Sequence, residues 1–144
     1  MALLVNHTAM YSPEKHIVDM LHQEGINIVG IFAPEHGLAS AMQDGAFSKE
    51  EGVLHPETGA RLYDITALRG TDRLTELLSE VDIAVYDIQD VGARFYTYLC
   101  NLTQLMRAAR DAGKPVLVLD RPNPIGNRIC EGLLLDESRF SSFV

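Results

Sequence analysis

The most constraining feature of this sequence is the alternation of short apolar runs with amphipathic helical patterns. Four runs rich in Val, Ile and Leu predict β-strands at residues 2–5, 26–32, 82–87 and 115–119. Strands that alternate with helices form βαβ units with right-handed crossovers, so the sheet is expected to be parallel. The predicted fold class is therefore α/β, with a Rossmann-like parallel sheet flanked by helices.

Three helices are predicted from the spacing of apolar residues and from the residues that begin and end helices. The first covers residues 13–24, because Ser12 and Pro13 suit a helix start and Gly25 suits its end. The second covers about 72–81, where leucines recur with helical spacing. The third covers about 95–112 and stops at Gly113. Its buried face is expected to hold Phe95, Tyr98, Leu99, Leu102, Leu105, Met106 and Ala109.

Residues 33–71 form a long connection with little periodicity, apart from a possible short strand at 61–65. Connections of this length inside a compact domain are usually functional or contain an element that the pattern does not reveal.

Length and charge exclude several classes of protein. A chain of 144 residues fits one domain, expected over residues 1–144. A net charge of −8 without a basic stripe argues against nucleic acid as a partner. The apolar runs are too short for a membrane span, and no signal-peptide pattern is visible, which leaves localisation open between the cytoplasm and export. Cys100 and Cys130 lack the spacing of a zinc knuckle or a disulfide framework.

Polar residues follow every one of the four predicted strands. In an open parallel sheet, the carboxyl ends of the strands lie at one edge, where ligands bind. Glu35, Asp87 and Asp120 should therefore lie on the same edge. The other candidates for substrate binding are Asn6, His36, Asp90, Arg94, Arg121 and Asn123.

Glu35 is the strongest single candidate for a catalytic group. It lies between Pro34 and His36 at a strand end, where partial shielding from water suits a general acid. Tyr98 falls on the apolar stripe of the third helix, whereas Tyr96 is turned away from it, toward the predicted site. Each of these residues could also serve only to shape turns or cap helices.

Several common catalytic and binding motifs are absent. The sequence contains no GxGxxG, GxxxxGK[ST] or GxSxG motif, and its histidines lack HExxH spacing, so no cofactor and no metal site are predicted. A metal-dependent hydrolase that uses Asp87, Asp90 and Asp120 remains an alternative.

Five segments together resemble the exo-β-N-acetylmuramidase family, formerly a domain of unknown function. The resemblance covers nearly the whole chain. The segments are Val5-Asn6-His7-Thr8, Ala33-Pro34-Glu35-His36-Gly37, His55-Pro56-Glu57-Thr58-Gly59, the run from Asp87 to Tyr98, and the run from Leu119 to Gly126.

The resemblance implies a glycoside hydrolase that releases terminal N-acetylmuramic acid from the non-reducing ends of peptidoglycan fragments. Its substrate would be a muropeptide or disaccharide. Glu35 matches the proton donor, and the second catalytic group would be Asp87, Asp90, Tyr96 or the acetamido group of the substrate. Arg94, Arg121 and Asn123 would position the substrate, with the lactyl carboxylate a suitable target.

The resemblance also bears on domain organisation, because family members are more than twice as long as this chain. The chain is therefore expected to be an N-terminal Rossmann-like catalytic domain without its C-terminal domain, which could self-associate or act only as an inactive ligand-binding fragment. Residues 38–47 depart from the family pattern, so no substrate contacts are carried over to them.

Overall fold

The structure is a computed structural model that describes residues 1–39, 52–126, 128–134, 136 and 138. The principal sheet has six strands in the order β5-β6-β4-β1-β7-β8, and a two-stranded hairpin lies outside it. The elements follow one another in this order: β1 (Ala2–Val5), β2 (Met10–Ser12), β3 (Lys15–His16), α1 (Ile17–Gln23), β4 (Gly30–Ala33), β5 (Val53–Leu54), β6 (Arg61–Asp64), α2 (Arg73–Ser79), β7 (Ala84–Asp87), α3 (Tyr98–Asp111) and β8 (Val116–Val118).

All pairings in the principal sheet are parallel except that of the short β5 with β6. Numbered along the chain, the five parallel strands stand in the order 3-2-1-4-5, which is the start of the Rossmann order. The predicted parallel α/β fold is confirmed.

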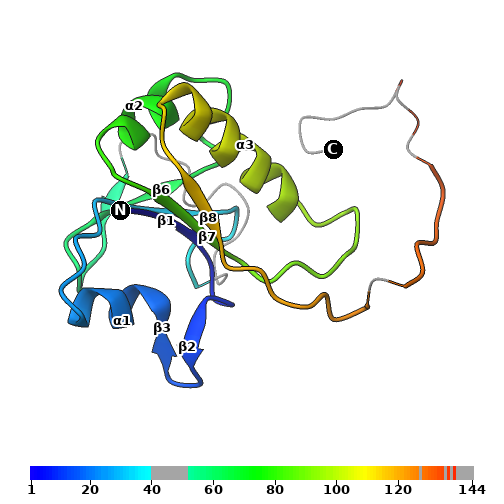
Figure 1. Cartoon of the computed structure of the whole chain (residues 1–144), viewed down its shortest axis with the longest axis horizontal. Coiled ribbons are helices and arrows are strands. Elements are labelled where there is room, and N and C mark those ends of the chain that lie inside the picture. Colours follow the sequence, from blue (N-terminus) through cyan, green and yellow to red (C-terminus); the bar gives the residue numbers. More distant parts are fainter. Residues whose placement is uncertain (40–51, 127, 135, 137, 139–144) are drawn as a thin grey trace.

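Helices cover both faces of the sheet (Figure 1). Side chains alternate along β1, so Ala2 and Leu4 join the core beneath α2 and α3, whereas Leu3 and Val5 join the core beneath α1. All four are buried, as expected for a central strand of a doubly covered sheet.

The first predicted helix begins later than expected. Ser12 ends β2, and Pro13 and Glu14 form the turn of the β2-β3 hairpin instead of the first helical turn. The N-cap of α1 is His16, whose Nδ1 accepts a hydrogen bond from the Val18 N–H. Ser-Pro suits a turn as well as a helix start, and pairing with β3 decides between them.

The third helix also begins later than predicted. Of its predicted buried face, Tyr98, Leu102, Leu105 and Ala109 pack on the core. Phe95 precedes α3 and is 81% exposed, while Leu99 and Met106 point toward solvent. The buried face of α3 carries Asn101, Leu105, Ala108 and Ala109. The apolar residues of this segment therefore exceed what the sheet below it can cover.

The second strand is shorter than its apolar run. The backbone N–H of Val29 bonds to Met1 O, and β4 begins at Gly30, opposite Ala2, the first residue of β1. Strand length is thus set by the partner strand. The possible strand at 61–65 is confirmed as β6, whereas β5 and the β2-β3 hairpin were not predicted.

Cys100 and Cys130 form no disulfide in the part of the chain that the structure describes. None of the helices in the described ranges has the length and apolar character needed to cross a membrane.

Candidate functional site

The candidate site lies at the carboxyl edge of the sheet, around the point where strand order reverses. Strand β1 lies between β4 and β7, so the connections that leave β1 and β7 diverge at this edge. Glu35, Asp87 and Asp120 follow or end β4, β7 and β8, which run parallel with β1. The predicted convergence of the strand ends is therefore confirmed.

A hydrogen-bond network built on Asn6 and Thr8 fills the centre of this edge. Asn6 is fully buried, and its Oδ1 accepts hydrogen bonds from the Thr8 N–H at 2.9 Å and the Thr8 hydroxyl at 2.6 Å. The Thr8 hydroxyl oxygen accepts the Gln89 N–H at 2.9 Å. The network joins the segments that follow β1 and β7, so Asn6 stabilises the carboxyl edge of the sheet from its buried position.

His16 reinforces the network from the hairpin. Its Nε2 lies 2.8 Å from the carbonyl oxygen of Asn6, and its Nδ1 accepts the Val18 N–H. Because a carbonyl oxygen only accepts, the ring proton belongs on Nε2.

Arg121 connects β8 with the same network. Its guanidinium forms an ion pair with Asp87 and donates a second hydrogen bond to Thr8 O at 2.8 Å. Asp87 is 7% exposed, and burial raises the pKa of its carboxyl, while Arg121 and then His16 act in the opposite direction. Asp87 and Arg121 thus bind one another and hold the segments after β1, β7 and β8 together.

Glu35 lies beside this network, at the end of β4. Its Oε1 accepts a hydrogen bond from the Thr97 hydroxyl, just before α3. Its Oε2 is buried and has no hydrogen-bond partner among the described residues. Hence one carboxyl oxygen is fixed by the protein, and the other has an unfilled hydrogen-bonding capacity within the described residues.

The turn that holds Glu35 is tight and strained. His36 has a φ of 77°, which is unusual for a residue with a side chain, and Gly37 follows with a φ of 76°. The Gly37 N–H closes the turn on Pro34 O at 3.1 Å. Strain of this kind often persists at functional sites, where the surrounding structure maintains it.

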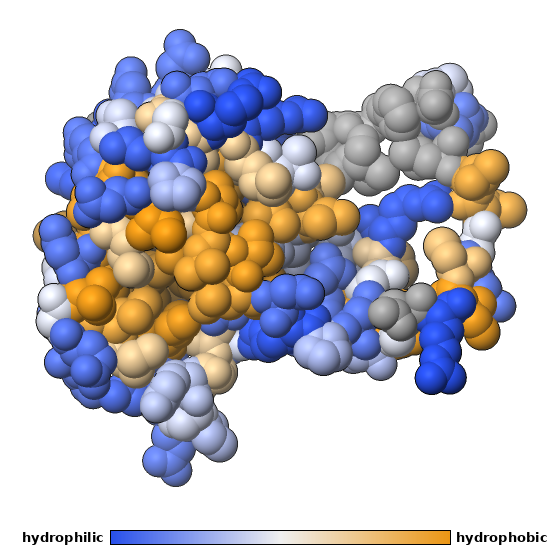
Figure 2. Space-filling model, in the orientation of Figure 1, coloured by the Kyte–Doolittle hydropathy of each residue, from blue (hydrophilic) through white to orange (hydrophobic). Residues whose placement is uncertain are grey.

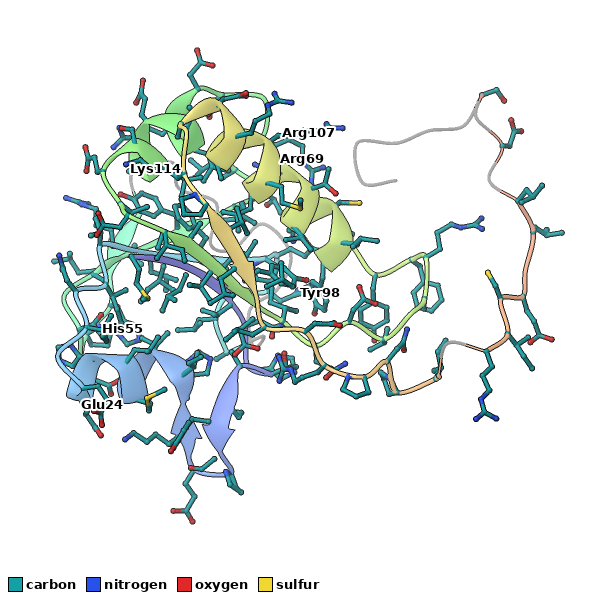
Figure 3. All side chains as sticks on the ribbon, in the orientation of Figure 1. Glu24, His55, Arg69, Tyr98, Arg107 and Lys114 are labelled. Carbon is teal, nitrogen blue, oxygen red and sulfur yellow. The ribbon has the colours of Figure 1, made fainter. Side chains whose placement is uncertain are left out.

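Aromatic side chains border the site near the start of α3. Tyr96 is 40% exposed and meets Tyr98 edge to face, with 5.7 Å between the ring centres. Tyr98, at the start of α3 (Figure 3), packs against the core as predicted. Burial raises the pKa of the Tyr98 hydroxyl; Asn6 opposes this, and Glu35 acts in the same direction as burial.

The remaining predicted residues lie on the loops of the same edge. Asp90 accepts the Gly92 N–H at 2.6 Å, and the Asn123 side chain packs so closely on Gly92 that a Cβ there would clash with it. Arg94 and Asp120 are exposed, as is His36.

Sequence reasoning did not single out Thr8, Gln89, Thr97 or Asn101. Thr8 and Thr97 lie inside the motifs that carry the family resemblance, and this location in the sequence could have identified them as site residues. Asn101 is fully buried on α3, one turn after Thr97, and neither polar atom of its side chain has a partner within the described part of the chain.

The carboxylates proposed for the metal-dependent alternative do not form a cluster. Asp87 is paired with Arg121, and Asp90 accepts a backbone N–H. Within the described ranges, the group of side chains close enough to share an ion is a different one, Asp19, His55 and Glu57.

Comparison with known proteins identifies relatives of the whole chain. A family model described as the N-terminal part of the exo-β-N-acetylmuramidase NamZ matches residues 1–144. The chain is 37% identical, over 143 residues, to the peptidoglycan β-N-acetylmuramidase NamZ of Bacillus subtilis, covering 99% of this chain and 34% of that protein.

Solved structures show the same relationship. Two DUF1343 family proteins from Bacteroides fragilis superpose with TM-scores of 0.80 and 0.75, at 31% and 34% identity. Each comparison covers 99% of this chain and 35% of the other. The chain thus spans about a third of the length of the relatives that it matches.

Proposed function

The chain belongs to the family of the N-terminal part of the exo-β-N-acetylmuramidase NamZ, and from this membership we propose that it carries the catalytic acid of a glycoside hydrolase. The proposed reaction releases terminal N-acetylmuramic acid from the non-reducing ends of peptidoglycan fragments. Because the chain spans about a third of its relatives, the proposal assigns it one wall of the substrate cleft.

The observation that carries the proposal is the unequal environment of the two Glu35 oxygens. Thr97 fixes Oε1, whereas Oε2 is buried and unpartnered within the described residues. A proton on Oε2 would have no protein acceptor there, so a glycosidic oxygen placed beside it would be the natural recipient. General acid catalysis of this kind is a principal step in most glycosidases.

Of the candidates for the second catalytic group that the sequence offered, Asp87 is the least suitable. Asp87 is ill suited to attack a sugar, because it is buried and ion-paired with Arg121. Asp90 and Tyr96 lie on the accessible side of the site, and the substrate's own acetamido group is a further candidate. We therefore place the second role with Asp90, Tyr96 or the substrate.

Recognition of the lactyl carboxylate falls to Arg94 in this proposal. Two guanidinium nitrogens of Arg121 already donate hydrogen bonds to Asp87 and Thr8 O, whereas Arg94 is exposed on the loop beside Tyr96. A guanidinium can bind a carboxylate through two parallel hydrogen bonds.

The proposal can be tested in a chimera in which residues 1–144 replace the matching segment of Bacillus subtilis NamZ. Glu35→Gln preserves shape but removes the transferable proton, and it should lower turnover of a muramic-acid-terminated disaccharide by about 10²–10⁴-fold. The loss should be smaller for a substrate with an activated aryl leaving group, which needs less protonation. Glu80→Gln, on the exposed end of α2, is the matched control.

Three outcomes would count against the proposal. Unchanged turnover of both substrates in Glu35→Gln would remove Glu35 as the acid. Loss of activity in EDTA with recovery in Mg²⁺ would favour the metal-dependent hydrolase. An inactive but folded chimera that still binds the disaccharide would favour the ligand-binding fragment.

A further inference from the structure

A second cluster of chemically reactive side chains lies at the opposite edge of the sheet from Glu35. Asp19 on α1 and both His55 and Glu57, from the connection between β5 and β6, bring one ligand atom each within 4.8 Å of one another. Figure 3 shows His55 just above α1. The connection precedes Arg61, the first residue of β6, and therefore lies at the amino edge.

His55 is the unusual member of this cluster. Its side chain is nine-tenths buried, with a residue exposure of 9%. Thr58 accounts for the ring nitrogen Nδ1, through its N–H at 3.4 Å and its hydroxyl at 3.2 Å. No hydrogen bond from Nε2 to another described residue is present, so this nitrogen of a largely buried imidazole is open to a ligand.

The charges around His55 are also unbalanced. Asp19 and Glu57 form no ion pair with a lysine or arginine within the described part of the chain. Two carboxylates beside a buried imidazole repel one another unless a proton or a cation lies between them. Together, these side chains favour a divalent cation.

We propose that Asp19, His55 and Glu57 bind a Zn²⁺ ion. The imidazole favours Zn²⁺ over Mg²⁺ or Ca²⁺, which prefer sites made only of oxygen ligands. With an ion on Nε2, the proton of the neutral His55 ring would lie on Nδ1, which would then donate to the Thr58 hydroxyl and give up the bond that it accepts from the Thr58 N–H. A donor bond of this kind is the outer-shell arrangement that orients metal-bound histidines.

A fourth candidate ligand lies on α1, outside the group of three side chains. His22 follows Asp19 by three residues on the helix, and both line a surface cavity of about 570 Å³ together with Glu57. Four ligands from two segments would complete the tetrahedral set that structural zinc sites use.

The position of the cluster indicates a structural role. Both residues of β5 are exposed, so β5 itself contributes little apolar burial to this part of the chain. An ion shared with α1 would fix this connection to the body of the domain. Because the ion would lie at the edge remote from Glu35, this inference does not depend on the proposed glycosidase function.

The test is isothermal titration of the EDTA-treated 144-residue chain with Zn²⁺, accompanied by thermal melts. One equivalent should bind and raise the melting temperature, while Mg²⁺ and Ca²⁺ should not. Asp19→Asn and Glu57→Gln keep shape and should each weaken binding by at least about 10–100-fold, the cost of losing an outer-shell partner. Co²⁺ should give the visible absorption of a tetrahedral site.

Glu14→Gln is the matched control, because Glu14 lines the same cavity but lies outside the cluster. Equal weakening in Glu14→Gln would reveal diffuse charge attraction and overturn the site. The proposal also fails if the folded wild-type chain binds no Zn²⁺, or if Mg²⁺ or Ca²⁺ binds as well. Circular dichroism of each variant separates loss of the ion from loss of the fold.

Discussion

Asp87 shows how burial and charge compete at a single residue. Its carboxyl pairs with Arg121, yet burial outweighs the pair and raises its pKa above the ordinary value of 3.8. Substitution of one member of a buried ion pair normally leaves the charge of the other member uncompensated. Here the guanidinium would keep its bond to Thr8 O and is one-third exposed, so it would remain partly solvated.

The raised pKa predicts a pH-dependent difference between the wild type and Asp87→Asn. The folded state holds the Asp87 proton to higher pH than the unfolded state does, so its stabilising contribution is full below the unfolded value and is lost as pH rises through the folded value. Asparagine does not titrate. As pH rises above about 4, the wild type should therefore lose stability relative to the variant, until the folded-state carboxyl has also lost its proton.

Urea denaturation at several pH values measures this difference in the free energy of unfolding. Asp82→Asn, at an exposed aspartate, controls for loss of charge elsewhere. If Asp87→Asn instead loses stability relative to wild type as pH rises, the ion pair outweighs burial and the stated balance is wrong.

At the scale of elements, α3 shows which part of the structure the sequence could supply. The length of its periodic pattern correctly indicated a long helix that stops at Gly113. The pattern could not indicate how much of the apolar face is buried, because that depends on how much of α3 the sheet and α2 cover.

Contacts between distant segments account for most of what the sequence left open. The motif residues indicated an edge of the sheet, and topology then brought Glu35, Asp87 and Arg121 together. The hydrogen bond from Thr97 to Glu35 joins residues far apart in the chain, so no local sequence pattern could predict it. The same holds for the cluster around His55.

The observed phase of α3 predicts unequal effects of two leucine truncations. Leu105 is fully buried on the inner face of α3, so Leu105→Ala should cost about 2–5 kcal/mol of unfolding free energy through lost packing and a cavity. Leu99 is 61% exposed, and Leu99→Ala should remain within about 0.5 kcal/mol of wild type. Equal losses in chemical denaturation would contradict the assigned face.

The loop after β7 offers a second test at this scale. Gly92 has a φ of 72°, and a Cβ there would meet the Asn123 side chain. Gly92→Ala should lose roughly 1–2 kcal/mol from the backbone conformation, and crowding should add about 1–3 kcal/mol. Gly70→Ala has a similar φ of 74° with open space, so it should show the first cost alone. Thermal melts that rank Gly70→Ala as equal or worse would show that Asn123 does not constrain the loop.

At the scale of the whole molecule, the face around β8 is incompletely covered. Strand β8 is an edge strand, with exposures of 47% at Leu117 and 39% at Val118, and α3 adds Leu99 and Met106. Figure 2 shows apolar side chains gathered on the face that carries β8 in Figure 1. An unpaired edge beside exposed apolar side chains is a template for association with another polypeptide.

The chain of 15.9 kDa is therefore expected to self-associate as its concentration rises. The driving force is burial of the exposed apolar side chains around β8, together with pairing along β8. Leu117→Lys places a charge on the edge strand and should shift the molecule toward monomer in sedimentation velocity. Lys114→Leu, which removes a charge before β8, should act in the opposite direction.

In the chimera with Bacillus subtilis NamZ, the added polypeptide should cover this face, so Leu117→Lys should reduce stability there instead of preventing association. A wild-type chain that stays monomeric at all concentrations would show that the face around β8 needs no partner.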